Sequence, residues 1–334
     1  MNISISQELL MEYIRLFWPS LRHFANGYEP IIFKGHKPIP EYFMYICPMC
    51  VSNYMIFFSD GFYCSAEFDM DHFPPQNAGG TLKAIVCKPC NSRAGYEFDY
   101  ATKEFLNELG FNKRIPFSIL KTRHTISDVV GRHTGTVVID ERGEIEFSLK
   151  KNPDARIKPL DEFIRDRLHT PTWKAEVTIP TTDKEKLAKA LLKAAYLTCF
   201  NHWGYDFIFS DTAQYMRETL AGNNIYPFKN MPAFIFDSEE DIDRIPLGVC
   251  FLKEPTEWQV YMVNMPVRLK DTDYRCIVSV LIPPPGGWLE LNKLNDVILE
   301  DRVQEIKILP LNPGLLRKKY DAYSTDWEEL TKTD

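Results

Sequence analysis

Residues 69–91 read DMDHFPPQNAGGTLKAIVCKPCN. This stretch contains two aspartates, one histidine, a Pro-Pro pair, a Gly-Gly pair and a closing Cys-x-x-Cys-Asn. A second Cys-x-x-Cys pair, CPMC, lies upstream at residues 47–50. The pattern therefore predicts either a metal-dependent site that cuts a substrate, or a zinc-stabilised fold that also carries a histidine.

The two cysteine pairs predict one structural zinc ion. Tetrahedral Zn²⁺ takes four thiolates, and an all-cysteine set leaves no open position for a substrate. The expected ligands are Cys47, Cys50, Cys87 and Cys90. The alternatives are buried cysteines without a metal and a redox-active pair, and two pairs that flank one compact unit disfavour both.

The composition is that of a globular chain without a strongly basic surface. The 334 residues are 45% hydrophobic and 13% aromatic, which favours two domains over one. The net charge of −7 indicates that any nucleic-acid contact is local, because proteins that coat nucleic acid are usually basic. No apolar run approaches the roughly 18 residues of a membrane span, and the N-terminus lacks a signal-peptide pattern. We therefore expect a cytoplasmic protein with reduced cysteines.

The segment between and after the cysteine pairs predicts two strands followed by a helix. NYMIFF at 53–58 and FYCSAEFDM at 62–70 have strand composition and are joined by the turn signal SDG. A loop is expected up to Cys87, and residues 87–110 then predict a helix that ends at Gly110. The expected unit is a ββα arrangement with zinc at its base.

The rest of the chain predicts a mixture of helices and strands. The hydrophobic patterns predict a hairpin at 135–149, a short helix at 158–169, a strand at 173–180, a long helix at 183–200 and several strands within 245–310. The long helix is the clearest of these elements, because its apolar residues recur at helical spacing over five turns.

The residues around the second cysteine pair resemble a known family. An Asp-His, a glycine-containing loop and a Cys-x-x-Cys-Asn are similar to the HNH, or ββα-metal (His-Me finger), nucleases. The paired cysteines resemble the zinc-bearing type of this family, the phage endonucleases that resolve branched DNA (endonuclease VII type). A second resemblance is to bacterial HNH proteins linked to phage defence, and their signature reads here DHFPPQNAGGTLKAIVCKPCNSRAGYEFD. The resemblance covers residues 47 to about 105 and implies a metal-dependent endonuclease that acts in antiphage defence.

The resemblance also gives an expected fold class and domain organisation. The fold class is α+β, with a zinc-stapled ββα-metal nuclease module and a second mixed α/β domain. Residues 1–115 would contain an N-terminal helix and the nuclease module. Residues 116–334 would form an accessory domain for substrate selection, dimerisation or docking of a regulatory protein.

The chemistry of phosphodiester hydrolysis accounts for the residue types in the motif. A water must become nucleophilic, and a cation must neutralise charge on the phosphate. His72 can accept the proton of the water, since histidine titrates near neutral pH. Asp71 and the amide oxygen of Asn91 are hard ligands suited to Mg²⁺ or Mn²⁺, and Asp69 ranks second to Asp71 as a ligand. The expected catalytic residues are therefore His72, Asp71 and Asn91, with an ion that is distinct from the zinc.

Each of these residues also has an ordinary structural interpretation. A histidine after an aspartate often satisfies a turn, and Asn91 could cap its helix. Adjacent residues of a strand point to opposite faces, so Asp71 and His72 serve one site only if the strand kinks or ends there. In addition, the residues TLKAIV at 81–86 contain no Asn or His to steady the base as in the family.

Three functions are therefore alternatives at this stage. The first is the ion-dependent endonuclease, for which DNA is the expected substrate, RNA stays open, and a net basic strip over residues 80–133 could contact phosphates. The second is a non-catalytic zinc module that binds nucleic acid or a partner protein. The third is a thiol redox protein without zinc. No membrane partner is expected, and the sequence leaves a homo-oligomer open.

Overall fold

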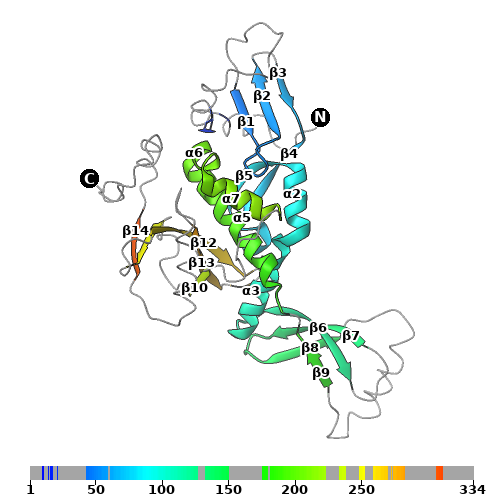
Figure 1. Ribbon diagram of the computed structural model, residues 1–334. Helices are drawn as coiled ribbons and strands as arrows, with labels where there is room; N and C mark the ends of the chain where they lie inside the picture. The colour runs from blue at the N-terminus through cyan, green and yellow to red at the C-terminus, as the bar shows by residue number, and fades with distance from the viewer. Residues whose placement is uncertain are drawn as a thin grey trace, which may run out of the picture. The chain divides into compact units, whose positions relative to one another are not determined.

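The protein is a mixed α/β chain with several small sheets (Figure 1). The computed structural model describes residues 43–58, 61–126, 132–149, 175–179, 181–222, 233–237, 248–252, 259–269, 272, 274–282 and 306–310, together with Leu10, Ile14, Leu16, Phe17 and Leu21. The expected combination of helices with sheets is confirmed at this coarse level.

The chain divides into two compact units. Unit 1 comprises residues 1–100, 184–267 and 275–334, and unit 2 comprises residues 101–183 and 268–274. These bounds differ from the boundary predicted near residue 115. The physical reason is that a long helix after unit 2 packs back onto the cysteine-bearing part of unit 1.

The first sheet of unit 1 contains three antiparallel strands in the order β1-β2-β3. Their bounds are Phe43–Ile46 for β1, Tyr54–Phe58 for β2 and Gly61–Cys64 for β3. The single strand predicted over 62–70 is wrong, because the chain leaves this sheet after Cys64. Ser65 ends the ladder, since its hydroxyl accepts the backbone N–H of Tyr54 at 2.8 Å.

The next two strands, β4 (Phe68–Phe73) and β5 (Leu82–Cys87), form an antiparallel hairpin. The loop predicted before Cys87 is therefore wrong. Residues 84–87 are buried, so β5 is a short apolar run without the polar alternation that marks a half-exposed strand. Gly80 closes the connecting loop, and a Cβ there would lie 1.6 Å from the carbonyl oxygen of Pro74.

Helical structure begins directly at the second cysteine pair. α2 (Lys88–Ala94) begins where the sequence predicted a helix, with Cys87 as its N-cap and a proline in its first turn. A π-helical segment, η3 (Gly95–Asp99), follows, and α3 runs from Tyr100 to Asn112. The helix therefore continues through Gly110, where a Cβ would lie 2.4 Å from the Leu269 side chain. This glycine permits close packing and does not end the helix.

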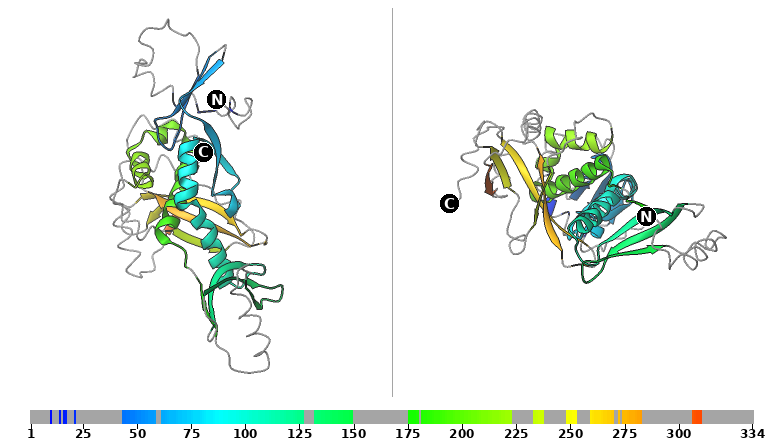
Figure 2. Two further views of the ribbon diagram at one scale, coloured as in Figure 1. Left: turned by 90° about the vertical axis from the view of Figure 1, so that its right-hand side faces the viewer. Right: turned by 90° about the horizontal axis from the view of Figure 1, so that it is seen from below.

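The long predicted helix is confirmed as α5 (Lys184–Trp203). It is followed by α6 (Tyr205–Ile208) and α7 (Asp211–Leu220), both of which contact it. α5 also contacts β4, β5 and η3 on one side and β13 (Arg275–Ile282) on the other (Figures 1 and 2). It is therefore the central helix of unit 1.

A five-stranded sheet completes the described part of unit 1 and confirms the strand-rich region predicted within 245–310. Its order is β10-β13-β12-β11-β14. The bounds of the remaining strands are Ala233–Asp237 for β10, Gly248–Leu252 for β11, Gln259–Arg268 for β12 and Ile306–Pro310 for β14.

The described N-terminal residues agree with the helix predicted there. Leu10, Ile14, Phe17 and Leu21 are helical and buried. Phe17 stacks on Phe200 of α5, with ring centroids 4.4 Å apart.

Unit 2 contains α3 from Ala101 onward and an antiparallel sheet in the order β8-β7-β6-β9. The strands are β6 (Ile119–Ile126), β7 (Arg132–Ile139), β8 (Ile145–Leu149) and β9 (Ala175–Thr178). The predicted hairpin and the predicted strand near 175 are confirmed, whereas the helix predicted at 158–169 lies outside the described residues. No helix in the described part of the chain is long and apolar enough to cross a membrane.

Candidate functional site

The four paired cysteines converge on one point. The sulfur atoms of Cys47, Cys50, Cys87 and Cys90 all lie within 4.8 Å of one another, and those of Cys50 and Cys87 are 3.8 Å apart. Four sulfurs around a tetrahedral Zn²⁺, with Zn–S bonds of about 2.3 Å, are separated by about 3.8 Å. The cluster can therefore hold a metal ion, and its donor set is that of a closed structural zinc site.

Two secondary-structure junctions bring these sulfurs together. The first pair follows β1, and its turn is closed by the Cys47 N–H, which donates to the Asn53 carbonyl oxygen at 2.7 Å. The second pair spans the end of β5 and the first turn of α2. A metal bound here would link the first sheet to the hairpin and its helix.

Hydrogen bonds from the protein reach sulfur atoms of the cluster. The Asn53 side-chain amide donates to Cys87 Sγ at 3.2 Å, and the backbone N–H of Cys87 donates to Cys47 Sγ at 3.3 Å. The neighbouring Cys47 lowers the pKa of Cys50 and lowers that of Cys87 to about 6, whereas burial raises the pKa of Cys47 itself. Asn53 is a supporting residue that cysteine spacing alone could not reveal.

Tyrosine side chains of α5 and α6 form hydrogen bonds with the backbone at the first cysteine pair. The Tyr196 hydroxyl donates to the carbonyl oxygen of Pro48, between the two cysteines, at 2.6 Å. The Tyr205 hydroxyl accepts the Ile46 N–H at 2.7 Å and donates to the Ile46 carbonyl oxygen at 2.5 Å. These contacts make the helices part of the scaffold that positions the cluster.

Asp71 is buried in the middle of β4, and its side chain is paired with a lysine of α5. Only 5% of Asp71 is exposed, and its Oδ2 lies 2.7 Å from Lys193 Nζ. Lys193 Nζ also lies 2.6 Å from Asp99 Oδ2, at the end of η3. Burial raises the pKa of Asp71 to about 6, although Lys193 opposes this effect. The sequence indicated neither Lys193 nor Asp99 as part of the site.

His72 lies on the other face of the same strand. The register of β4 is unbroken up to its end at Phe73, with Asp71 opposite Ala84 and His72 opposite Lys83. The strand therefore neither kinks nor ends between Asp71 and His72, and their side chains alternate. Within the described part of the chain, the His72 ring makes no hydrogen bond or ion pair. Burial and then the Lys83 cation lower the pKa of His72 below its ordinary value of 6.5, while Asp69 opposes the shift. The ring is therefore neutral at pH 7.

Asn91 approaches a different aspartate from the one first expected. Its side-chain amide donates to Asp69 Oδ2 at 3.5 Å, across the gap between α2 and the start of β4. The structure therefore brings Asn91 to Asp69, which ranked second as a ligand. Asp71 lies instead with Lys193, and His72 has no direct contact with Asn91 among the described interactions.

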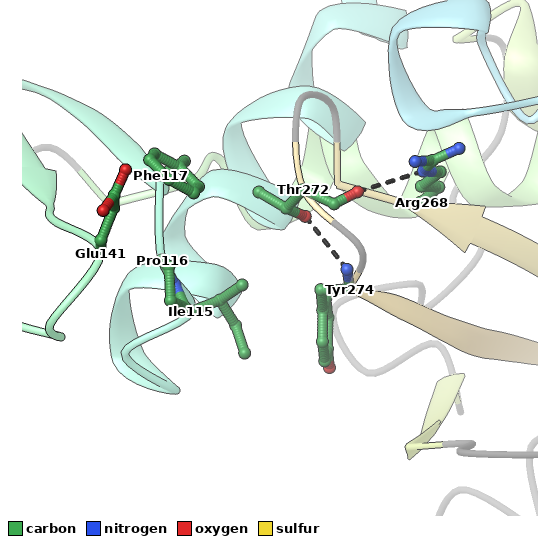
Figure 3. A pocket seen from close by; sticks show the side chains of 7 residues that line it. All are labelled: Ile115, Pro116, Phe117, Glu141, Arg268, Thr272 and Tyr274. Atoms are coloured by element: carbon green, nitrogen blue, oxygen red, sulfur yellow. Dashed lines mark hydrogen bonds between the residues drawn. The ribbon is translucent and has the colours of Figure 1, made fainter.

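Unit 2 contains a separate open pocket of about 630 Å³ (Figure 3). Its lining comes from the segment after α3, the β7–β8 turn and the segment 268–274: Ile115, Pro116, Phe117, Glu141, Arg268, Thr272 and Tyr274. Glu141 and Arg268 lie on opposite sides of it, and Arg268 Nε donates to the Thr272 carbonyl oxygen at 3.2 Å. The seven lining residues include no group of side chains that could hold a metal ion.

Comparisons with protein-family models, with curated proteins and with solved structures found no match for this chain. The function of the site is therefore argued from its own residues. The relevant arrangement is a four-cysteine cluster at the base of a hairpin and a helix, with Asp69 and Asn91 adjacent and His72 nearby in sequence.

Proposed function

We propose that this chain is a metal-dependent endonuclease of the HNH type, with Zn²⁺ in the cysteine cluster and Mg²⁺ or Mn²⁺ at the acidic site. DNA is the proposed substrate, and a role in antiphage defence is part of the same proposal. The single observation that carries it is the contact between Asp69 Oδ2 and the Asn91 amide at 3.5 Å, directly after the second cysteine pair.

The order of elements and the donor types support this proposal. β4, β5 and α2 follow one another as strand, strand and helix, with the cysteine cluster at the base. Asp69 and Asn91 offer a carboxylate and an amide oxygen, which are donors that Mg²⁺ and Mn²⁺ prefer. A bound divalent ion supplies charge neutralisation at the phosphate and activation of water.

The role of His72 in this proposal is that of general base. A neutral imidazole nitrogen accepts the proton of the attacking water, the new bond forms at phosphorus, and a phosphorus–oxygen bond of the backbone breaks. The leaving oxygen then takes a proton from solvent. The lowered pKa of His72 favours the neutral form that this step requires.

The divalent ion is the first requirement to test. Purified, zinc-loaded protein should convert supercoiled plasmid to open circles when Mn²⁺ or Mg²⁺ is added. Asn91→Ala should need roughly 10- to 100-fold more Mn²⁺ for the same rate, because one ligand is lost. Asn112→Ala, at the end of α3, is the matched control and should titrate like the unchanged protein. Equal titrations of the two variants would remove Asn91 from the site.

The nicking rate should decrease at acid pH, with a midpoint below pH 6.5. The protonated His72 ring cannot accept a proton, so the nicking rate falls as the pH decreases through its pKa, which burial and Lys83 hold below 6.5. Lys83→Ala removes one of these causes and should move the midpoint upward, toward 6.5, whereas Lys103→Ala on α3 should not. Nicking rates at saturating Mn²⁺ between pH 5 and 8 measure both midpoints. A midpoint that moves equally in the two variants would show that Lys83 has no specific effect on the base.

The competing candidate is a non-catalytic zinc module that binds nucleic acid or a partner protein. The specific observation in its favour is that Asp71 is paired with Lys193, while His72 lies on the face of β4 opposite both Asp69 and Asp71. This candidate predicts zinc binding and DNA or protein binding, without cleavage under any divalent ion. The nicking assay therefore separates the two functions.

A further inference from the structure

Lys193 is an unusual residue of α5 because its ammonium group is buried. Only 2% of the residue is exposed, in a helix segment whose neighbours are buried and apolar or hydroxyl-bearing. Lysine is almost never fully buried without a partner, since removing the charge from water is costly. A buried lysine in such a helix therefore indicates that its charge is paired with specific carboxylates.

Lys193 forms ion pairs with two carboxylates. Its Nζ lies 2.7 Å from Asp71 Oδ2 on β4 and 2.6 Å from Asp99 Oδ2 on η3. We call Lys193, Asp71 and Asp99 the buried charge triad. The three residues come from three different elements of unit 1, so the ammonium holds strand, π-helical segment and α5 together.

The neighbouring aspartate of the same strand has a different environment. Asp69 lies two residues before Asp71 and is more exposed, and its Oδ2 accepts a hydrogen bond from the Asn91 side-chain amide at 3.5 Å. A divalent ion at Asp71 would be adjacent to the Lys193 cation and would be repelled by it. An ion at Asp69 and Asn91 avoids direct competition for the oxygen that Lys193 already contacts.

We propose that Lys193 is a positioning residue that acts as a built-in cation for Asp71 and Asp99, so that the divalent ion belongs to Asp69 and Asn91. This inference rests on the proposed nuclease function and proposes Asp69 in place of Asp71 as the ligand of the divalent ion. The triad fixes the path of β4, and with it the positions of Asp69 and His72. Asp71 therefore contributes through Lys193 and not through the ion.

Direct measurement of Mn²⁺ binding tests this assignment. The full-length, zinc-loaded protein is titrated with Mn²⁺, and the free ion is followed by electron paramagnetic resonance. Asp69→Asn should raise the Kd for Mn²⁺ by roughly 10- to 100-fold, whereas Asp71→Asn should change it by less than about threefold. The opposite order, with Asp71→Asn as the variant that loses Mn²⁺, would overturn the assignment and leave the nuclease proposal intact. No Mn²⁺ binding by the unchanged protein would overturn both.

Variants of the triad test the positioning role. Lys193→Met leaves the buried Asp71 and the partly buried Asp99 without a cation and can fail to fold. The companion variant therefore carries Asp71→Asn, Asp99→Asn and Lys193→Met together. This variant buries no charge from the triad and should keep its fold, its zinc and its Kd for Mn²⁺. Its nicking rate at saturating Mn²⁺ should fall roughly 100-fold, because small displacements of reacting groups cost rates of this order. A folded triple variant that nicks at the unchanged rate would show that the triad is only structural, and would overturn the proposal.

Discussion

Replacing Cys87 with serine should release the bound zinc and unfold the cysteine-bearing part of unit 1. The four sulfurs lie within 4.8 Å of one another, so the loss of one removes a quarter of the ligand set. Structural zinc contributes about 10–16 kcal/mol in small zinc-binding peptides, which is comparable to the whole stability of a typical domain, about 5–15 kcal/mol. Zinc content by atomic emission and hydrogen exchange over residues 43–100 measure the two effects.

Cys64 offers the matched control for this experiment. It is a buried cysteine of β3 outside the cluster, so Cys64→Ser should keep one zinc per chain and lose only packing energy. A Cys87→Ser protein that retains its zinc and its hydrogen-exchange protection would contradict the structural role of the metal. A disulfide between the paired cysteines of the purified protein, without zinc, would favour the redox alternative.

Replacing His72 with alanine should abolish most of the nicking activity without disturbing the zinc. General-base catalysis contributes about 10²- to 10⁴-fold to a rate, so the expected loss at saturating Mn²⁺ is of that order. The ring makes no hydrogen bond or ion pair in the described part of the chain, so its removal should have little effect on folding. The rate of open-circle formation, compared at equal zinc content, measures the loss.

His124 of β6 is the control for this variant, since it is a histidine of unit 2. His124→Ala should nick at the unchanged rate. If His72→Ala retains the unchanged rate in every divalent ion, His72 is not the base.

The cysteine cluster could be predicted from the sequence because its signal is local. Two cysteine pairs of fixed spacing need only a turn and a helix start to present their sulfurs, and both features have sequence signatures. The long α5 helix was predicted for a similar reason, since its apolar periodicity extends over 20 residues.

The hairpin partner β5 was missed because burial removes the signal that marks a strand. Residues 84–87 are all buried, so the run shows no alternation and resembles an apolar loop next to Gly-Gly. The domain boundary near 115 rested on the same local information. It could not include the return of α5 to the hairpin, which depends on contacts far apart in sequence.

The proposal that Asp69 and not Asp71 binds the ion depended on tertiary structure for the same reason. Asp69 and Asp71 are equivalent in the sequence pattern, and only the folded chain separates them. Lys193 of α5 forms an ion pair with Asp71, whereas Asn91 of α2 donates a hydrogen bond to Asp69. A lysine within an apolar helix was the one available signal, and its partner could not be named from the sequence.

The most direct test of the central claim is the ion dependence of DNA cleavage by the full-length protein. The protein is prepared with one zinc per chain, and the conversion of supercoiled plasmid to open circles is followed with and without added Mn²⁺. The account predicts nicking that requires Mn²⁺ and stops when the ion is chelated, while the zinc stays bound. The absence of cleavage of duplex, branched or single-stranded DNA in either Mn²⁺ or Mg²⁺ would contradict it.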